Sequence, residues 1–460
     1  MIDRFKKKYI GDKAFYKRYI FIALPMIIQN FITNFVSFLD NIMVGQLGTE
    51  QMTGVAIINQ LQFIYALAIF GVAGAASIFG AQYYGKGDHK GHMYTFRFRL
   101  YAIALMSVLA ILVFILLGDK LVSMYLTADS GNGAATLKYA KQYMYIILIG
   151  FVPFALTQTY ASIVKETGQT LIPMLAGLAG VIINAVLDFV FIFGVGFIPA
   201  MGVKGAAIAT VVARFIECFT VVSWAHANRA KNLYLEGAYS GVGLPFDLFK
   251  RITIKGTPLI INEILWASGM TALTQSYSVR GLEIVASINI ANTINNLFNI
   301  VFIQLGACIS IIVGQYLGAG ELEEAKDADN KMIAFSVFCC VIMAIAMMAV
   351  GRFFPNLYNT SDYIREIATD FIYVQAFMMP FFAYSHATYF TLRAGGKTIV
   401  TFLFDCVFTW VIVVSCAYVL TRYTTLGIVT VYILVNATEF IKNAMGYFMV
   451  KSNVWLNKLV

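Results

Sequence analysis

The stretch Val181–Gly196, VIINAVLDFVFIFGVG, decides how the whole chain is interpreted. It is almost entirely apolar, yet it contains Asp188, and Asn184 four residues earlier would lie on the same face of a helix. A charged side chain at the centre of a membrane costs about 3 kcal/mol on insertion scales, so it persists where it faces a bundle interior or a wet cavity. Asp188 therefore marks a candidate ion or substrate pathway. Asp40, in NFITNFVSFLDNIMVG, is a second acid in comparable apolar surroundings.

The composition is that of a membrane protein. Of the 460 residues, 60% are hydrophobic and 12% are charged, whereas soluble domains have about 25% charged residues. Apolar runs of about 20 residues predict twelve membrane-spanning helices, and they lack the short alternating pattern of a membrane β-barrel. We therefore expect an all-α polytopic membrane protein. The expected spans are 19–44, 52–83, 95–117, 139–164, 171–194, 204–227, 252–278, 285–317, 332–351, 367–392, 398–420 and 427–450.

The basic residues predict the topology rather than a nucleic-acid partner. The net charge is +9, but the Lys and Arg residues concentrate before the first span and in alternate loops, including 228–250. This bias is typical of the cytoplasmic side, so both termini should be cytoplasmic in a multi-pass protein of the plasma (inner) membrane. The polar segment 228–250 divides the spans into a lobe at 1–227 and a lobe at 251–460, each with six spans.

The two halves also repeat. A constant separation of 233 residues pairs similar residues over about 60 positions of each half, which predicts duplication. Because six spans separate the halves, the repeat is parallel, and we expect two six-helix bundles that face each other across a cleft. The pairs are Pro25 with Pro258, Gly48 with Gly281, Asn59 with Asn292, Ser77 with Ser310, Gln82 with Gln315, Gly85 with Gly318 and Gly87 with Gly320.

The two acids have no counterparts in this repeat. Leu273 lies opposite Asp40, and the apolar segment WVIVVSCAYVL lies opposite Asp188, so we expect the carboxylate pair in the N-terminal half alone. Asp40 shares a helix face with Asn34 and Ser37, which are candidates for a substrate or second ion site. We expect the two acids to form one coupled site that binds H+ or Na+, with Pro25 as a bend point in the first span.

Other polar residues inside the spans give weaker signals. Glu263 and Asn292 are further candidates for a substrate or second ion site. Arg214 is the only basic residue that we expect well inside a span, and Glu217 three residues later is its expected partner. No HExxH motif and no P-loop is present, so we expect neither an enzyme nor a cofactor, and an ion gradient rather than ATP as the energy source.

These motifs resemble those of a known family. The segments LPMIIQN, LDNIMVGQLG, KETGQTLIPM, NAVLDFVFIFG and GVKGAAIAT, with the repeated QYxGxG, are similar to multidrug and toxic compound extrusion (MATE) transporters. This family belongs to the multidrug/oligosaccharidyl-lipid/polysaccharide exporter superfamily. The resemblance implies an antiporter that expels amphipathic organic cations in exchange for H+ or Na+, and that acts as a monomer in contact with membrane lipid.

The resemblance also implies roles for individual residues. Asp40, Asp188 and Asn184 match the acids and the Asn of DinF-like members, and Thr210 matches a polar residue of their sixth helix. Glu263 matches the seventh-helix acid of NorM-like members. Their tenth-helix acid has no equivalent in FMMPFFAYSHATYFTLR, which favours ion coupling in the N-terminal lobe.

Two other functions remain open from the sequence. The first is a lipid-linked precursor flippase of the same superfamily, whose members commonly have more spans and a cationic central cavity. The second is a non-transporting membrane sensor or channel, although the sequence contains no filter-like or soluble signalling segment.

Overall fold

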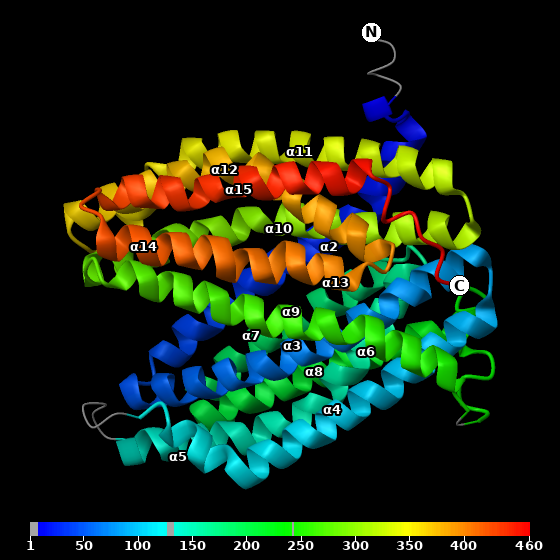
Figure 1. Ribbon diagram of the computed structural model, residues 1–460. Coiled ribbons are helices and arrows are strands. Elements are labelled where there is room, and N and C mark those ends of the chain that lie inside the picture. The colour runs from blue at the N-terminus through cyan, green and yellow to red at the C-terminus, as the bar shows by residue number, and fades with distance from the viewer. Residues whose placement is uncertain (1–7, 127–132, 242) are drawn as a thin grey trace. The chain divides into compact units, whose positions relative to one another are not determined.

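The computed structural model describes residues 8–126, 133–241 and 243–460, and the described residues are mostly helical (Figure 1). Through the first half run α2 (Lys13–Gly45), α3 (Thr49–Lys86), α4 (His89–Ser123), α5 (Gly133–Ile147), η1 (Leu148–Gly150), α6 (Phe151–Glu166), α7 (Leu171–Phe193), α8 (Val203–Ala227) and η2 (Leu233–Leu235). The second half contains α9 (Phe246–Ser278), α10 (Leu282–Ala319), α11 (Leu322–Gly351), η3 (Phe354–Leu357), α12 (Asp362–Ala394), α13 (Thr398–Phe402), η4 (Leu403–Val407), η5 (Thr409–Val414), α14 (Ser415–Tyr423) and α15 (Ile428–Lys451).

Each predicted span coincides with one helical segment, so the prediction of an all-α membrane protein is confirmed. The segments α5–η1–α6 and α13–η4–η5–α14 each form one continuous span. Within the described part of the chain, ten segments are long and apolar enough to cross a membrane. The other two, α9 and α15, have more polar sequences that include Glu263 and Lys442.

The predicted repeat is present in the local structure. Helices α2 and α9 both have 33 residues, and α3 and α10 both have 38. The glycines that precede α3 and α10, Gly48 and Gly281, have φ values of 123° and 121°, a conformation that residues with a Cβ rarely adopt. The sequence repeat therefore encodes the same helix lengths and the same turns twice.

The chain forms two compact units. The N-terminal unit comprises the described residues of Ile28–Gly80 and Asp88–Ile252. The C-terminal unit comprises those of Met1–Ile27, Ala81–Gly87 and Thr253–Val460. The start of α2 belongs to this second unit because its side chains bind α10: Tyr19 OH donates to the carbonyl oxygen of Leu305 at 3.1 Å.

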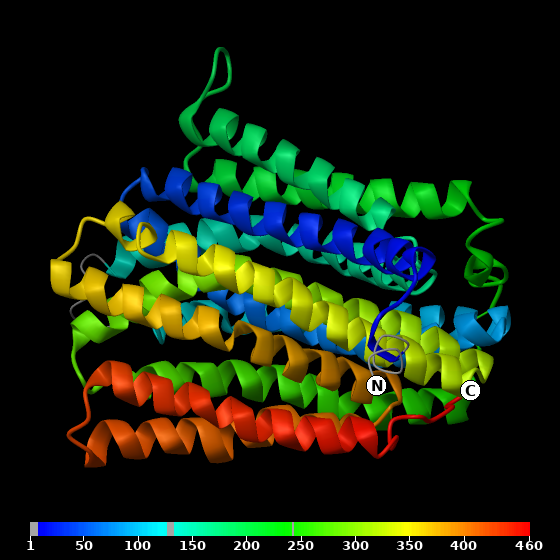
Figure 2. The same ribbon diagram turned by 90° about the horizontal axis from the view of Figure 1, so that it is seen from above.

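The core of the C-terminal unit lies along α12. Helices α10, α11 and α15 all pack against it, and they run side by side with it in Figures 1 and 2. Buried Phe371, Ala376 and Met379 of α12 lie among apolar residues of the neighbouring helices. Any charged side chain inside this unit therefore lies among close-packed helices.

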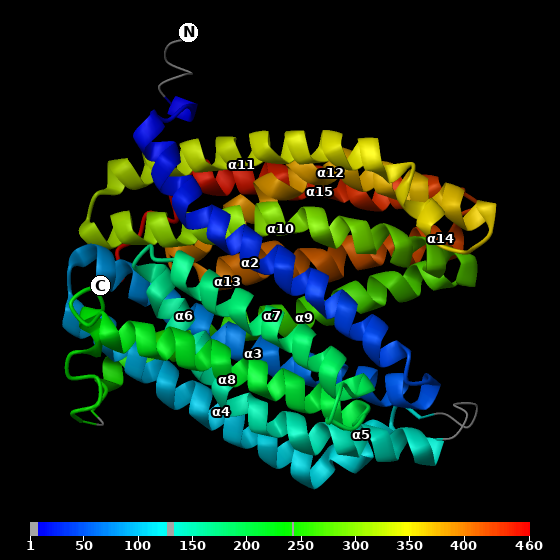
Figure 3. The same ribbon diagram turned by 180° about the vertical axis from the view of Figure 1, so that it is seen from behind.

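In the N-terminal unit, α8 packs against α5, α6 and α7, and Figure 3 shows α7 and α8 side by side. The connection after α8 is fixed to this unit by Arg97, whose guanidinium donates to the carbonyl oxygens of Gly237, Ala238 and Gly243 at 2.5, 2.9 and 2.6 Å. Within the same connection, burial raises the pKa of the Tyr234 phenol well above its usual value, so this group is neutral.

Candidate functional site

Three polar residues that we selected from the sequence meet in the N-terminal unit. Asp40 of α2 and Asp188 of α7 lie next to each other with their side chains in contact, and Asn184 lies beside Asp188. Asp188 is only 2% exposed and Asn184 9%. Asn184 and Asp188 face the same way because one helical turn separates them. The site is therefore a pair of carboxyls, with Asp188 buried and Asp40 half-buried, beside a buried amide.

The polar atoms of this site are not all satisfied. Oδ1 of Asp40, Oδ1 of Asp188 and Nδ2 of Asn184 are buried without a hydrogen-bond partner among the described residues. A buried polar group without a partner is destabilising by about 1–3 kcal/mol, and such groups are rare in native proteins. Unsatisfied carboxylate oxygens are suited to bind a proton or a hard cation such as Na+, so the donor set fits either ion.

A second layer of polar residues surrounds the carboxyl pair. Tyr143 of α5 lies beside Thr210 of α8, and its hydroxyl donates to Oδ1 of Asn59 at 3.2 Å. The charges of Asp40 and Asp188 act on Tyr143 as well, which places all these groups in one electrostatic environment. Thr210 therefore lies at the margin of the site, and its hydroxyl also donates to the carbonyl oxygen of Ala206 at 3.0 Å.

Arg214 of α8 is the basic residue whose charge acts on Asp40. Its predicted partner is confirmed, since Arg214 Nη1 lies 3.6 Å from Glu217 Oε2. The guanidinium also lies over the ring of Phe154, 4.7 Å from its centroid. Because Arg214 is already paired, its charge only partly offsets that of the two acids.

The remaining candidate residues lie elsewhere. Asn34 and Ser37 are exposed on α2, and the Asn34 amide donates to the carbonyl oxygen of Asn30 in its own helix at 2.9 Å. Asn292 of α10 and Glu263 of α9 are half-buried in the C-terminal unit. Glu263 interacts electrostatically with Arg393 and Asp405 of that unit.

Asp405 introduces a group of buried charges that the sequence analysis missed. The expectation that Arg214 is the only basic residue well inside a span was wrong, because Lys442 is buried in α15 and its Nζ lies 2.8 Å from Oδ1 of Asp405. Glu439 is buried one turn before Lys442. Acids of the C-terminal half are therefore also removed from solvent, Glu439 as a buried residue and Asp405 with a side chain that is 17% exposed. The spacing of Glu439 and Lys442, which are three positions apart on one helix, was a usable signal.

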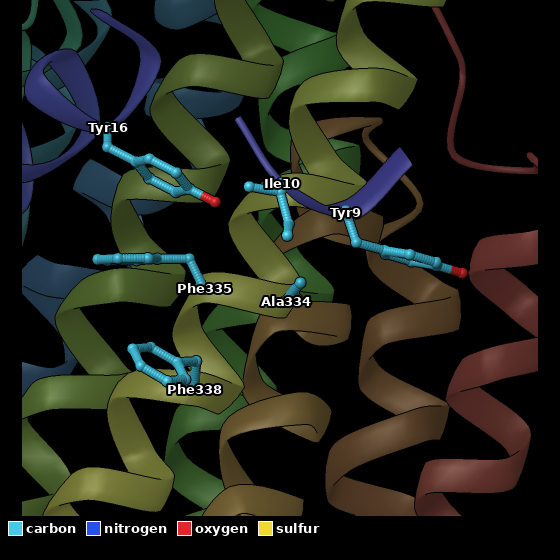
Figure 4. Close-up of a pocket in the computed structure, with 6 residues that line it drawn as sticks. All are labelled: Tyr9, Ile10, Tyr16, Ala334, Phe335 and Phe338. Carbon is cyan, nitrogen blue, oxygen red and sulfur yellow. The ribbon is translucent and has the colours of Figure 1, made fainter. Parts of the chain in front are cut away.

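A cavity of about 610 Å³ lies at another place in the C-terminal unit (Figure 4). Tyr9, Ile10 and Tyr16 line one side, and Ala334, Phe335 and Phe338 of α11 line the other. Its volume is within the usual range of ligand pockets, but its lining residues include no acid or base that could couple an ion to transport.

The sequence matches known proteins over most of its length. The profile of the MatE family matches residues 25–190 and 258–419. A protein of Thermotoga maritima named "Probable multidrug resistance protein NorM" is 21% identical over 444 residues, which cover 96% of this chain and 94% of that protein. A protein of the same name from Oceanobacillus iheyensis is 26% identical over 412 residues, or 89% of this chain and 90% of that protein.

Solved structures share the fold. One is described as "Outward-facing conformation of a multidrug resistance MATE family transporter of the MOP superfamily"; it superposes with a TM-score of 0.85 at 19% identity and covers 96% of this chain and 97% of that chain. The Vibrio cholerae MATE transporter VcmN in its bent form gives a TM-score of 0.84 at 16% identity, with 96% and 98% covered. The family profile, matched in both halves of a chain with this fold, shows that the protein is a multi-pass membrane protein that belongs to the MatE family.

Proposed function

We propose that this protein is a secondary active exporter of amphipathic, cationic organic compounds, driven by H+ or Na+ antiport through alternating access. The observation that carries the proposal is the contact between the half-buried carboxyl of Asp40 and the buried carboxyl of Asp188 within apolar helices. Its relatives are named multidrug resistance proteins, which supports drugs and similar compounds as the substrate class. The coupling ion is cargo, so no bound cofactor is required.

The chemistry of the pair suits an exchange of cations. Two carboxyls in contact can share one proton in a hydrogen bond, so this arrangement is suited to a pair that holds a proton. Two acids in direct contact titrate as a pair, since ionisation of one opposes ionisation of the other. Loss of the proton leaves negative charge that attracts Na+ or a cationic substrate. If the ion and the substrate cannot bind at the pair together, entry of the ion can drive export of the substrate.

Movement of α2 would connect this exchange to alternating access. Asp40 lies on α2, and Pro25 in the same helix removes one backbone hydrogen bond, which makes a bend at that place less costly. The boundary between the compact units also follows Pro25 directly, after Ile27. We propose that protonation of the acid pair and the bend of α2 change together. The protein would act as a monomer in the plasma membrane, with both termini cytoplasmic and lipid around its apolar surface.

Transport by the purified protein in liposomes tests this function. Efflux of a fluorescent organic cation should follow an imposed pH or Na+ gradient, and the two gradients should be applied separately to identify the ion. Asp40→Asn and Asp188→Asn should each abolish gradient-driven transport. Asp119→Asn is a matched control, because Asp119 is an exposed acid of α4 whose partner is Lys141 at the surface. Wild-type coupled transport by either Asp40→Asn or Asp188→Asn would refute the proposal.

A further inference from the structure

The C-terminal unit contains a second group of buried charges, formed by α9, α12, η4 and α15. Asp405 of η4 accepts hydrogen bonds on both carboxylate oxygens: Lys442 Nζ lies 2.8 Å from Oδ1, and Asn262 Nδ2 lies 3.1 Å from Oδ2. The side chains of Lys442 and Asp405 are 10% and 17% exposed. This ion pair is therefore largely removed from solvent, and both oxygens of Asp405 are occupied.

Further contacts surround the ion pair. Asp405 lies in a π-helical segment, a geometry that often occurs at functional sites because it alters the direction of side chains within a helix. The Lys442 ammonium lies 5.3 Å from the ring centroid of Phe404 and 6.0 Å from that of Phe408, within the range of cation–π attraction. Lys442 is thus a resident cation of the C-terminal unit, fixed on Asp405.

Glu439 differs from Asp405, because among the described residues no cation forms an ion pair with it. It lies one turn before Lys442 on the same face of α15, and it is 8% exposed. The charges of Lys442 and Asp405 act on it, but Lys442 Nζ contacts Asp405. With Asp405 and Glu439 both ionised, this group of three residues has one negative charge in excess. An excess negative charge in a buried group favours binding of one positive charge. Glu439 is the residue that would bind it.

The hydrogen bonds around Glu439 can accommodate this positive charge as a proton. The Ser385 hydroxyl is within hydrogen-bonding distance of Glu439 Oε1 and also lies 2.7 Å from Asn443 Oδ1. A hydroxyl has a single proton, so it can donate to only one of these oxygens. If Glu439 is protonated, it donates to Ser385 and Ser385 donates to Oδ1 of Asn443, so both contacts of the Ser385 hydroxyl are satisfied.

A second complete arrangement exists for the ionised form. Nδ2 of Asn443 is buried without a partner, and a half-turn of the amide would direct it toward Ser385. Asn443 then donates to Ser385, and Ser385 donates to the Glu439 carboxylate. The same three side chains therefore accommodate both forms of Glu439, and the two arrangements differ by one proton and one amide rotation.

We propose that Glu439 is an exchangeable proton-binding site of the C-terminal unit, with the Lys442–Asp405 ion pair as its fixed counter-charge and Ser385 and Asn443 as its hydrogen-bond relay. Proton binding at Glu439 stands by itself, whereas its use to drive transport rests on the ion-coupled export proposed above. With Glu439 ionised, Lys442 is attracted by two carboxylates; with Glu439 protonated, it is attracted by Asp405 alone. Exchange of the proton thus changes the strength of a contact between α15 and η4.

Other titratable groups near Glu439 interact with the Lys442–Asp405 ion pair. His386 of α12 interacts with Lys442 and Asp405, and its Nδ1 lies 3.1 Å from the carbonyl oxygen of Phe382. Glu263 of α9 interacts with Asp405 and with Arg393 of α12. A pH titration of the C-terminal unit must therefore separate Glu439 from His386 and Glu263, which requires a signal specific to a protonated carboxyl.

Infrared difference spectroscopy of the full-length protein in lipid provides that signal, the C=O stretching band of a carboxylic acid. We expect a wild-type band that disappears as the pH rises and that is absent from Glu439→Gln. Asp40→Asn and Asp188→Asn should keep it, and Glu263→Gln should keep it as the matched acid control in the same unit. This measurement needs no substrate, so it can fail or succeed independently of drug transport.

A second variant keeps the proposal testable if Glu439→Gln does not fold. Ser385→Ala retains the acid but removes its relay, so the band should remain and should shift to the higher frequency of a less strongly hydrogen-bonded acid. The proposal is overturned if Glu439→Gln shows the full wild-type set of pH-dependent bands. An unchanged band position and titration midpoint in Ser385→Ala would overturn it as well.

Discussion

Gly318→Ala should destabilise the C-terminal unit through a backbone clash. A Cβ atom added at Gly318 would lie 1.8 Å from the carbonyl oxygen of Gln82, and one added at Gly85 would lie 1.9 Å from that of Gln315. Non-bonded atoms require about 3.5 Å, and a backbone carbonyl cannot rotate away as a side chain can. The ends of α3 and α10 would therefore have to move apart.

The magnitude follows from two opposing effects. Overpacking in a well-packed interior is destabilising by about 1–3 kcal/mol, and a clash with backbone on one fixed side belongs at the upper end of that range. Alanine is a better helix former than glycine by about 1 kcal/mol, which offsets part of this loss. We expect a net decrease of about 2 kcal/mol in the free energy of unfolding.

Thermal unfolding of the purified protein, followed by fluorescence, would measure this effect as a lower midpoint temperature. Gly180→Ala in α7 is the matched control, because Gly180 is also inside a helix but its added Cβ would meet its nearest neighbours at 3.4 Å, an ordinary contact. This control should be neutral or slightly stabilised. If Gly318→Ala unfolds at the same temperature as Gly180→Ala, the helix ends do not approach as closely as we infer.

Two further predictions concern topology and the secondary acid. Membrane-impermeant thiol labelling of intact cells should modify Asn359→Cys but not Lys231→Cys. The reason is that the distribution of basic residues predicts a cytoplasmic 228–250 connection. Labelling of Lys231→Cys would contradict the predicted topology. Glu263→Gln should keep partial gradient-driven transport in liposomes, since its charge acts on Asp405 and Arg393 rather than on the carboxyl pair of the N-terminal unit. Complete loss of transport with normal expression would instead assign ion coupling to the C-terminal unit.

The sequence was most informative about acidic residues inside apolar spans, because this combination is rare. An acid within an apolar span is costly, so Asp188 and Asp40 stood out without any knowledge of the fold. Asp405 and Glu439 also lie in expected spans, but neither occupies a position that the repeat places opposite Asp40 or Asp188. The signal for the basic residue Lys442 is its spacing from Glu439, which is visible in the sequence.

The sequence by itself determined the helices and their duplication. Hydropathy is local, so runs of apolar residues define the spans, and a constant 233-residue separation defines the repeat of helix lengths and glycine turns. Only the tertiary structure decided which polar groups meet. Asp40 contacts Asp188, and Lys442 contacts Asp405 rather than Glu439, because these distances depend on how helices rotate and pack. Periodicity gives the face on which a side chain lies, but the partner on that face is set by packing between segments far apart in the chain.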